Sequence, residues 1–285
     1  MTLQSIVGGR TSGGRLLFAL ITALCLMMMY APTLYLLLAS LNPDEQLGLV
    51  APSRYSLTWY LALLDDRRLF RALQESAVVA LATAALATSI GLAAALAYRA
   101  MTRMRGIFIL VMLSTIFVPG TIEGLGLSAI LRLVRVSPSW VTVTIGHLLW
   151  TLPFAIMVSL IGLSAVRPST IAAARDLGAG PMRAFVDVTL PLIRGSLLSS
   201  FVFAFLLSLN EYARTYYLVG RQNTLPLYMF GAMNSGASPT IYAFSGAVLV
   251  ASFAVVALIF FSTARRQRGL PGVSLAISQR TEISN

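Results

Sequence analysis

Residues 168–195 read PSTIAAARDLGAGPMRAFVDVTLPLIRG, a polar interval between two long apolar runs. Gly178 can end a short helix in a left-handed conformation. Pro181 can open a second helix, because proline suits the first helical position. We expect the pair Leu190 and Pro191 to close that second helix. The interval therefore predicts a helix-turn-helix that lies outside the apolar segments.

The composition around this interval is that of a membrane protein. Of the 285 residues, 57% are hydrophobic and 11% charged, against about 45–50% apolar and about 25% charged in soluble domains. A chain of this length holds about six spans of ~20 residues. We expect an all-α membrane protein with a tail at 1–15, a domain of six transmembrane helices at 16–263 and a second tail at 264–285.

The predicted spans are runs with few or no charges. They are 16–41, 76–98, 106–122, one span within 136–166, 196–218 and 241–263. Residues 57–73 have the composition of an amphipathic surface helix. Residues 219–239 are rich in Gly, Pro, Asn and Ser, so we expect an external loop or a re-entrant element there.

The charge distribution predicts the topology. All 21 basic residues are arginines, and the net charge is +11. Placing both termini, residues 99–105 and residues 167–195 on one side puts 13 arginines against three acids there, a net +10. The rest of the chain has eight arginines against seven acids, a net +1. Basic residues collect on the cytoplasmic side, so we expect both termini and the 168–195 loop in the cytoplasm.

This uneven distribution of arginine argues against a surface that binds nucleic acid. Without lysine the chain has no Walker-type phosphate loop.

The interval resembles a known family. The run A-A-R-D-L-G-A at 173–179, followed by Phe185 and by V-T-L-P-L at 188–192, is similar to the coupling loop, or EAA loop, of permease subunits of bacterial ABC importers. With S-L-N-E-Y at 208–212, L-P-L-Y and S-P-T-I-Y-A further on, the chain most resembles the second permease of spermidine/putrescine-type importers. The leading Glu of the motif falls on Ala172 here.

The resemblance implies a type I ABC importer permease fold in the bacterial inner membrane. It also implies these partners: two ATPase subunits that bind ATP and Mg, a homologous permease (a heterodimer) and a periplasmic binding protein. The chain itself would bind no cofactor. The positions that would dock the ATPase are Ala172, Ala173, Ala174, Asp176, Gly178, Ala179, Phe185, Leu190 and Pro191. The alternative for the interval is a basic amphipathic loop that lies on lipid headgroups.

Ionisable residues inside spans point to a substrate pathway. Each costs on the order of 2.5–3.5 kcal/mol even on mild insertion scales, so such residues tend to face a cavity or a partner. The candidate pathway residues are Glu123, Trp150, Asn210, Glu211, Tyr212 and Tyr216. Aromatic faces beside the acids could add cation–π contacts. The alternative is structural: Glu211 paired with Arg214 three residues on, and Glu123 paired with Arg132 or Arg135.

Catalytic and metal-binding patterns are missing. His147, the only histidine, has no cysteine or second histidine nearby, which argues against a metal site and favours a neutral side chain bonded within the bundle. Neither G-x-S-x-G nor a Ser-Lys pair occurs. We therefore expect a transporter, not an enzyme.

The expected substrate is a small cationic amino solute, such as a polyamine. Opines, other amino compounds and aminophosphonates are the alternatives within the class. Asn210 and Glu211 stand where polyamine permeases tend to carry two acids. Outside the class, the competitor is an ion-coupled secondary transporter, which would need no docking loop and would usually show an internal repeat.

Overall fold

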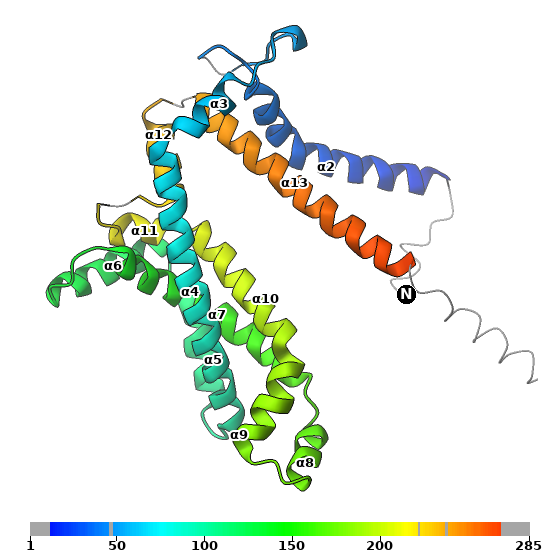
Figure 1. Ribbon diagram of the computed structural model, residues 1–285, viewed down its shortest axis with the longest axis vertical. Coiled ribbons are helices and arrows are strands. Elements are labelled where there is room, and N and C mark those ends of the chain that lie inside the picture. The colour runs from blue at the N-terminus through cyan, green and yellow to red at the C-terminus, as the bar shows by residue number, and fades with distance from the viewer. Residues whose placement is uncertain (1–11, 46–47, 222, 237–238, 269–285) are drawn as a thin grey trace, which may run out of the picture. The chain divides into compact units, whose positions relative to one another are not determined.

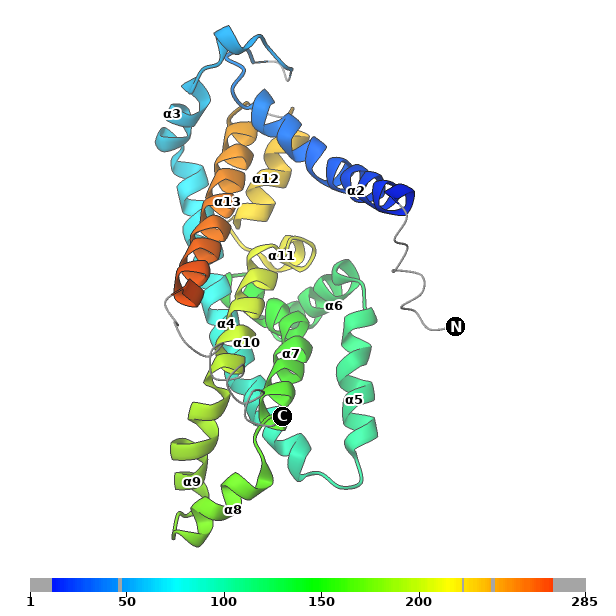
Figure 2. The same ribbon diagram turned by 90° about the vertical axis from the view of Figure 1, so that its right-hand side faces the viewer.

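The computed structural model describes residues 12–45, 48–221, 223–236 and 239–268, and all regular structure in those ranges is helical (Figures 1 and 2). Contacts divide the chain into two compact units, residues 66–235 and a second unit formed by the first 65 residues together with residues 236–285. Most of the two expected terminal tails lies outside the described residues. The remainder of each tail belongs to a helix.

Three long helices form the centre of the larger unit. They are α4 (Arg67–Ala100), α7 (Trp140–Ser164) and α10 (Leu190–Leu209). Small residues allow close approach of their backbones. A Cβ at Gly91 on α4 would lie only 2.9 Å from the Cβ of Ala155 on α7. The buried cluster between the three helices consists of Ala84, Ala87, Ala155 and Ala204.

The third predicted span, 106–122, is wrong only in its last residues, where the chain breaks at Pro119. The chain forms α5 (Arg105–Ser114) and the short helix η2 (Thr115–Phe117), and then turns by 102° into α6 (Gly120–Leu133). The turn falls at Pro119, because proline disfavours helical geometry in the residue before it. The residues that follow the predicted third span are therefore mostly helix, up to Leu133.

The boundaries of the fifth predicted span are also wrong. Helical structure runs without a break from Pro181 to Leu209, through α9 (Pro181–Ala184), the five-residue π-helical turn η3 (Phe185–Thr189) and α10. Leu190 and Pro191 do not close a helix. The N–H of Leu190 reaches back five residues to the carbonyl of Phe185, and Pro191 takes a first-turn position, where its missing N–H costs little.

Two short helices follow α10. They are α11 (Ala213–Leu218), which the sequence predicted as the end of the fifth span, and α12 (Leu225–Asn234), which lies in the segment expected to be a loop or a re-entrant element. The Leu225 N–H donates to Ser76 Oγ of α4 at 2.7 Å. This bond fastens α12 to the long helix.

The smaller unit holds α2 (Ser12–Ala39), α3 (Thr58–Asp65) and α13 (Pro239–Arg268), with the short helix η1 (Pro52–Arg54) between α2 and α3. Ser40 Oγ lies 2.6 Å from Tyr60 Oη, which links the end of α2 to α3. The predicted amphipathic helix at 57–73 is wrong as one element. Asp66 interrupts it and caps α4 instead.

Four helices within the described residues are long and apolar enough to cross a membrane. The bent pair formed by α5 with η2 and by α6 counts as a fifth span if its two arms are taken together. The described apolar part of α13, Pro239–Ala254, is shorter than a full span. The chain is thus an all-α, multi-span membrane protein.

Candidate functional site

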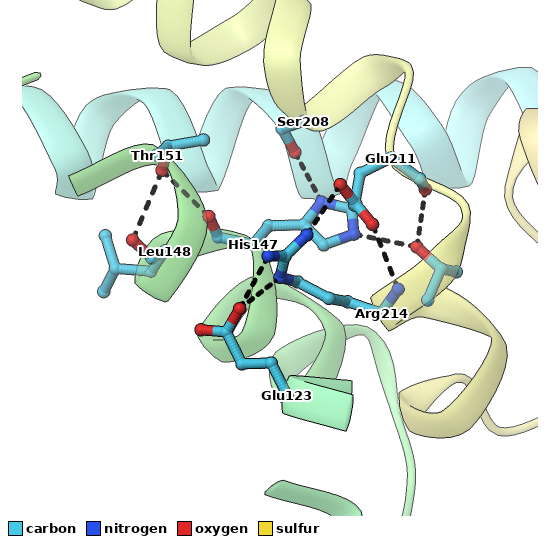
Figure 3. Close-up of polar contacts among 8 residues, drawn as sticks. Glu123, His147, Leu148, Thr151, Ser208, Glu211 and Arg214 are labelled. Carbon is cyan, nitrogen blue, oxygen red and sulfur yellow. Dashed lines mark hydrogen bonds and ion pairs between the residues drawn. The ribbon is translucent and has the colours of Figure 1, made fainter. Parts of the chain in front are cut away.

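A buried guanidinium joins two segments of the larger unit that are far apart in the sequence. Arg214 on α11 donates to Glu123 Oε2 in the first turn of α6, from Nε at 2.7 Å and from Nη2 at 2.6 Å. Its Nη1 donates to Glu211 Oε2 at 3.0 Å, and its backbone N–H donates to Glu211 Oε1 at 3.0 Å. Figure 3 shows the two carboxylates gathered on this one side chain. We call these three residues the ion cluster.

The ion cluster combines a buried guanidinium with two half-buried carboxylates, and its charges do not balance. The side chains of Arg214, Glu211 and Glu123 are 4%, 11% and 14% exposed. Two carboxylates and one guanidinium leave one net negative charge. A buried charge without compensation is costly in a membrane protein, so the site favours a further cation.

Two glycines on α6, Gly120 and Gly124, allow Arg214 to pack closely against this helix. A Cβ at Gly120 would lie 2.7 Å from Arg214 Nη1, and a Cβ at Gly124 would lie 3.0 Å from Arg214 Cα. The indole of Trp150 on α7 covers another side, with Arg214 Cζ 4.7 Å from its ring centre. The carboxylates, the indole face and Gly120 thus surround the guanidinium, and Gly124 lets the backbone of Arg214 approach α6 closely.

His147 holds the segment that carries the ion cluster. Its Nδ1 lies 2.7 Å from Ser208 Oγ near the end of α10, and its Nε2 lies 2.8 Å from Thr215 Oγ1 on α11 (Figure 3). Thr215 donates its own hydroxyl proton to the Glu211 carbonyl at 2.8 Å. The Thr215 oxygen must then accept from Nε2–H, which leaves Nδ1 to accept from Ser208. His147 is therefore neutral and positions both sides of the break at 210–212.

The other predicted pathway residues lie apart from these ion pairs. The Asn210 amide donates to the Leu206 carbonyl at 2.9 Å, as a helix-end contact. The ring of Tyr212 lies 4.5 Å from Phe230 and 6.0 Å from Tyr216, centre to centre. Among the described residues, no hydrogen bond joins the hydroxyl groups of these two tyrosines to the ion cluster.

The alternative pairing of Glu123 with Arg132 or Arg135 is wrong, because its partner is Arg214 from a distant segment. The predicted Glu211–Arg214 pair is present. Sequence reasoning gave Arg214 no central place. The only sequence signal for that place is the spacing of Gly120, Glu123 and Gly124 on one turn of helix.

The predicted loop at 168–195 has the expected turn. Helix α8 (Pro168–Asp176) is followed by Leu177 and then by Gly178, whose φ of +86° confirms the left-handed conformation. The N–H groups of Gly178 and Ala179 close the turn on the carbonyls of Arg175 and Ala174, at 2.9 and 3.0 Å. Such a turn satisfies the carbonyls at a helix end.

Surface exposure divides the predicted docking residues into two groups. Ala172, Ala173, Asp176, Gly178 and Pro191 are exposed, whereas Ala174, Ala179, Phe185 and Leu190 are half-buried. Leu177, at the tip, is 90% exposed. Ile171 packs on a cluster that includes Leu163 and Ile193, which anchors the loop to α7 and α10. An anchored loop with an apolar tip is suited to enter a cleft on another protein.

A further polar contact fixes α12. Tyr228 Oη donates to Asp66 Oδ2 at 2.6 Å, and Asp66 Oδ1 accepts from the N–H groups of Arg68 and Leu69. Partial burial by itself raises the pKa of Asp66, but the bonds from Tyr228 and the two N–H groups bring that pKa below its usual value. Burial and the Asp66 carboxylate raise the pKa of Tyr228 to about 12.

Known structures with a similar fold define the class. The chain superposes on a subunit of a bacterial ABC transporter that imports alginate, with a TM-score of 0.63 at 16% identity over 90% of this chain and 98% of that one. The same comparison with the MetNI methionine ABC transporter gives 0.56 at 18% identity, over 70% and 95%. The fold is that of ABC transporter permeases. No family model matches the chain.

Relatives by sequence are permease subunits of polyamine transport systems. The chain is 28% identical to the putrescine transport system permease protein PotI of Escherichia coli, over 84% of this chain and 88% of PotI. It is 27% identical to the spermidine/putrescine permease PotC of Haemophilus influenzae, over 81% and 90%. The chain is thus homologous to permease components of ABC importers and is a transport protein, not an enzyme.

Proposed function

We propose that the chain forms half of the translocation pathway of an ATP-driven importer for a small cationic amino solute of the polyamine type. In this proposal it crosses the bacterial inner membrane six times, with both termini and the 168–195 loop in the cytoplasm. A periplasmic binding protein delivers the solute, and a homologous permease completes the pathway. Two ATPase subunits bind ATP and Mg and receive the loop.

The observation that carries the proposal is the continuous path from the loop to the ion cluster. Helical structure extends over the 29 residues from Pro181 to Leu209, about 40 Å at 1.5 Å per residue. One end adjoins the exposed tip at Leu177, and the other adjoins Glu211. A movement imposed on the loop by an ATPase would therefore reach Glu211 across the short break at 210–212.

A cationic solute is supported by the negative charge of the ion cluster and by the putrescine and spermidine named for the relatives. An alginate importer of similar fold has been seen in complex with its periplasmic protein, which supports a binding-protein partner. Opines, other amino compounds and aminophosphonates are the competing solutes. An ion-coupled secondary transporter is disfavoured, because it would have no use for an exposed docking tip.

The test compares two glycines of the loop. A side chain on Gly178 must adopt a left-handed conformation, which costs roughly 1–2 kcal/mol, whereas Gly180 has an ordinary φ of −64°. Neither Cβ would touch another part of the chain. We expect Gly178→Ala to reduce the population of the docking conformation by about 5- to 30-fold and Gly178→Asp to abolish docking. Gly180→Ala should behave like the wild type.

The measurements are ATP-dependent putrescine uptake and co-purification of the ATPase, both per inserted permease. Impermeant maleimide should label a cysteine at Ser53 but not one at Gly180, in a Cys25→Ala background. Normal uptake and co-purification in Gly178→Asp, or external labelling at Gly180, would refute the docking role.

A further inference from the structure

The carboxylates and the indole that could bind a transported cation already contact the guanidinium of Arg214. Glu123 and Glu211 bind the Arg214 guanidinium through charge-assisted hydrogen bonds of 2.6–3.0 Å, and Trp150 offers it a ring face. Two carboxylates and an aromatic face form a complete recognition set for an ammonium or guanidinium group. The site for the solute and the position of Arg214 are therefore the same.

We propose that Arg214 is an internal substitute for the transported cation. It occupies the two carboxylates while no solute is present, and it leaves them when an organic cation binds. The inference rests on the proposed function, because it requires the solute to be an organic cation. It assigns to Arg214 a role in specificity: a neutral solute has no means of displacing a guanidinium from two acids.

The free edge of Glu123 provides the point of entry. Both of its contacts with Arg214 use Oε2, and Oε1 makes no hydrogen bond to another described residue. An ammonium group can therefore bind Oε1 first, where it compensates the extra negative charge of the cluster. Competition for Oε2 follows. A solute with two cationic groups has an advantage, because it can satisfy Glu123 and Glu211 together.

The exchange has a mechanical effect on the helices. The bonds between Glu123 and Arg214 are the ionic link between α6 and α11, whose backbones meet closely at Gly124. Displacement of Arg214 removes that link while His147 continues to hold α11 to α7 and α10. Binding of the solute thus replaces the direct ionic link between α6, the bent arm of the third span, and α11 by a link through the solute.

The first test uses the wild-type complex of this chain with its partner permease and ATPases in nanodiscs. Phenylglyoxal reacts with free guanidinium groups, and mass spectrometry reports the modification of Arg214 relative to Arg54, an exposed arginine that pairs with Asp44. We expect millimolar putrescine to raise the Arg214-to-Arg54 ratio severalfold. The uncharged diol of the same chain length should leave the ratio unchanged.

The second test measures binding of radiolabelled putrescine to the same complex without the binding protein. Arg214→Gln removes the internal competitor, so we expect binding about tenfold tighter or more, a gain of about 1.4 kcal/mol. The matched control, Arg54→Gln, should bind like the wild type. If Arg214→Gln does not assemble, the labelling of the wild type decides.

The inference is overturned if putrescine does not change the Arg214-to-Arg54 labelling ratio. It is also overturned if an assembled Arg214→Gln complex binds putrescine as weakly as the wild type or more weakly. If the wild type takes up putrescine in either case, the proposed function stands and only the role of Arg214 falls. A wild-type complex that takes up no organic cation would overturn both proposals.

Discussion

Replacing Gly124 by alanine should separate α6 from α11. The added Cβ would lie 3.0 Å from Arg214 Cα, and 3.2 Å from both the Arg214 carbonyl oxygen and a ring carbon of Tyr217. Two of these three atoms belong to the backbone, so a side-chain rotation cannot relieve the contact. Gly126, two residues on along the same helix, has open space around its Cβ and provides the matched control.

The expected magnitude follows from the difference between the two variants. Overpacking of a filled contact costs typically 1–3 kcal/mol. Replacement of a helical glycine by alanine gains about 1 kcal/mol in helix propensity at either position, so this gain cancels in the comparison. Gly124→Ala should therefore be about 2 kcal/mol less stable than Gly126→Ala. At about 2–4 °C per kcal/mol for a large domain, the apparent Tm should differ by about 4–8 °C.

The assay is thermal unfolding of the assembled complex in detergent at one scan rate, because unfolding of such a protein is kinetically controlled. Putrescine uptake per complex provides a second reading. The shift of α11 also changes the distance between Arg214 and Glu123, so putrescine uptake per complex should change in Gly124→Ala but not in Gly126→Ala. Equal stability of the two variants would contradict the close α6–α11 packing and the geometry of the ion cluster.

Two further predictions concern the polar contacts. His147→Phe should lower the apparent Tm by several degrees and His147→Gln by less. Phe leaves the Ser208 hydroxyl without its hydrogen-bond partner, at about 1–3 kcal/mol for a buried unsatisfied group, and removes one of the two bonds of the Thr215 hydroxyl. Equal values for the two variants would contradict this. Asp66 has a lowered pKa in the folded chain, so its contribution to stability is present at neutral pH and is lost as the pH falls through that lowered value. Tyr228→Phe should therefore be less stable than the wild type at neutral pH, with a difference that shrinks as the pH falls through the lowered pKa of Asp66. A difference independent of pH would contradict the assignment.

The loop at 168–195 was predictable because its determinants are local. A glycine after a short helical segment is the residue that accepts φ of +86° at low cost, and Pro181 opens α9 as expected. The prediction that Leu190 and Pro191 end a helix was wrong, and the reason is equally local. Proline is tolerated in a first helical turn as well as beyond a helix end, and only the surrounding backbone decides between the two.

The ion cluster was predictable only in part. Glu211 and Arg214 are three residues apart, a spacing at which side chains meet. Glu123 and Arg214 are separated by 91 positions, and nothing in the sequence indicates that α6 turns by 102° to bring them together. Pro119 signals that the third span breaks, but tertiary packing against α11 sets the direction of the second arm.

The π-helical turn at Phe185–Thr189 has a rotational consequence. A π-turn contains one residue more than an α-turn, and each residue of an α-helix adds about 100° of rotation and 1.5 Å of rise. If the ATPase drives this turn into α-helical geometry, the docking tip and α10 must counter-rotate by about that angle. Torque, and not only displacement, would then pass along the helix. The change would occur in whole-residue steps of register, so the membrane end would have two discrete orientations with none between them.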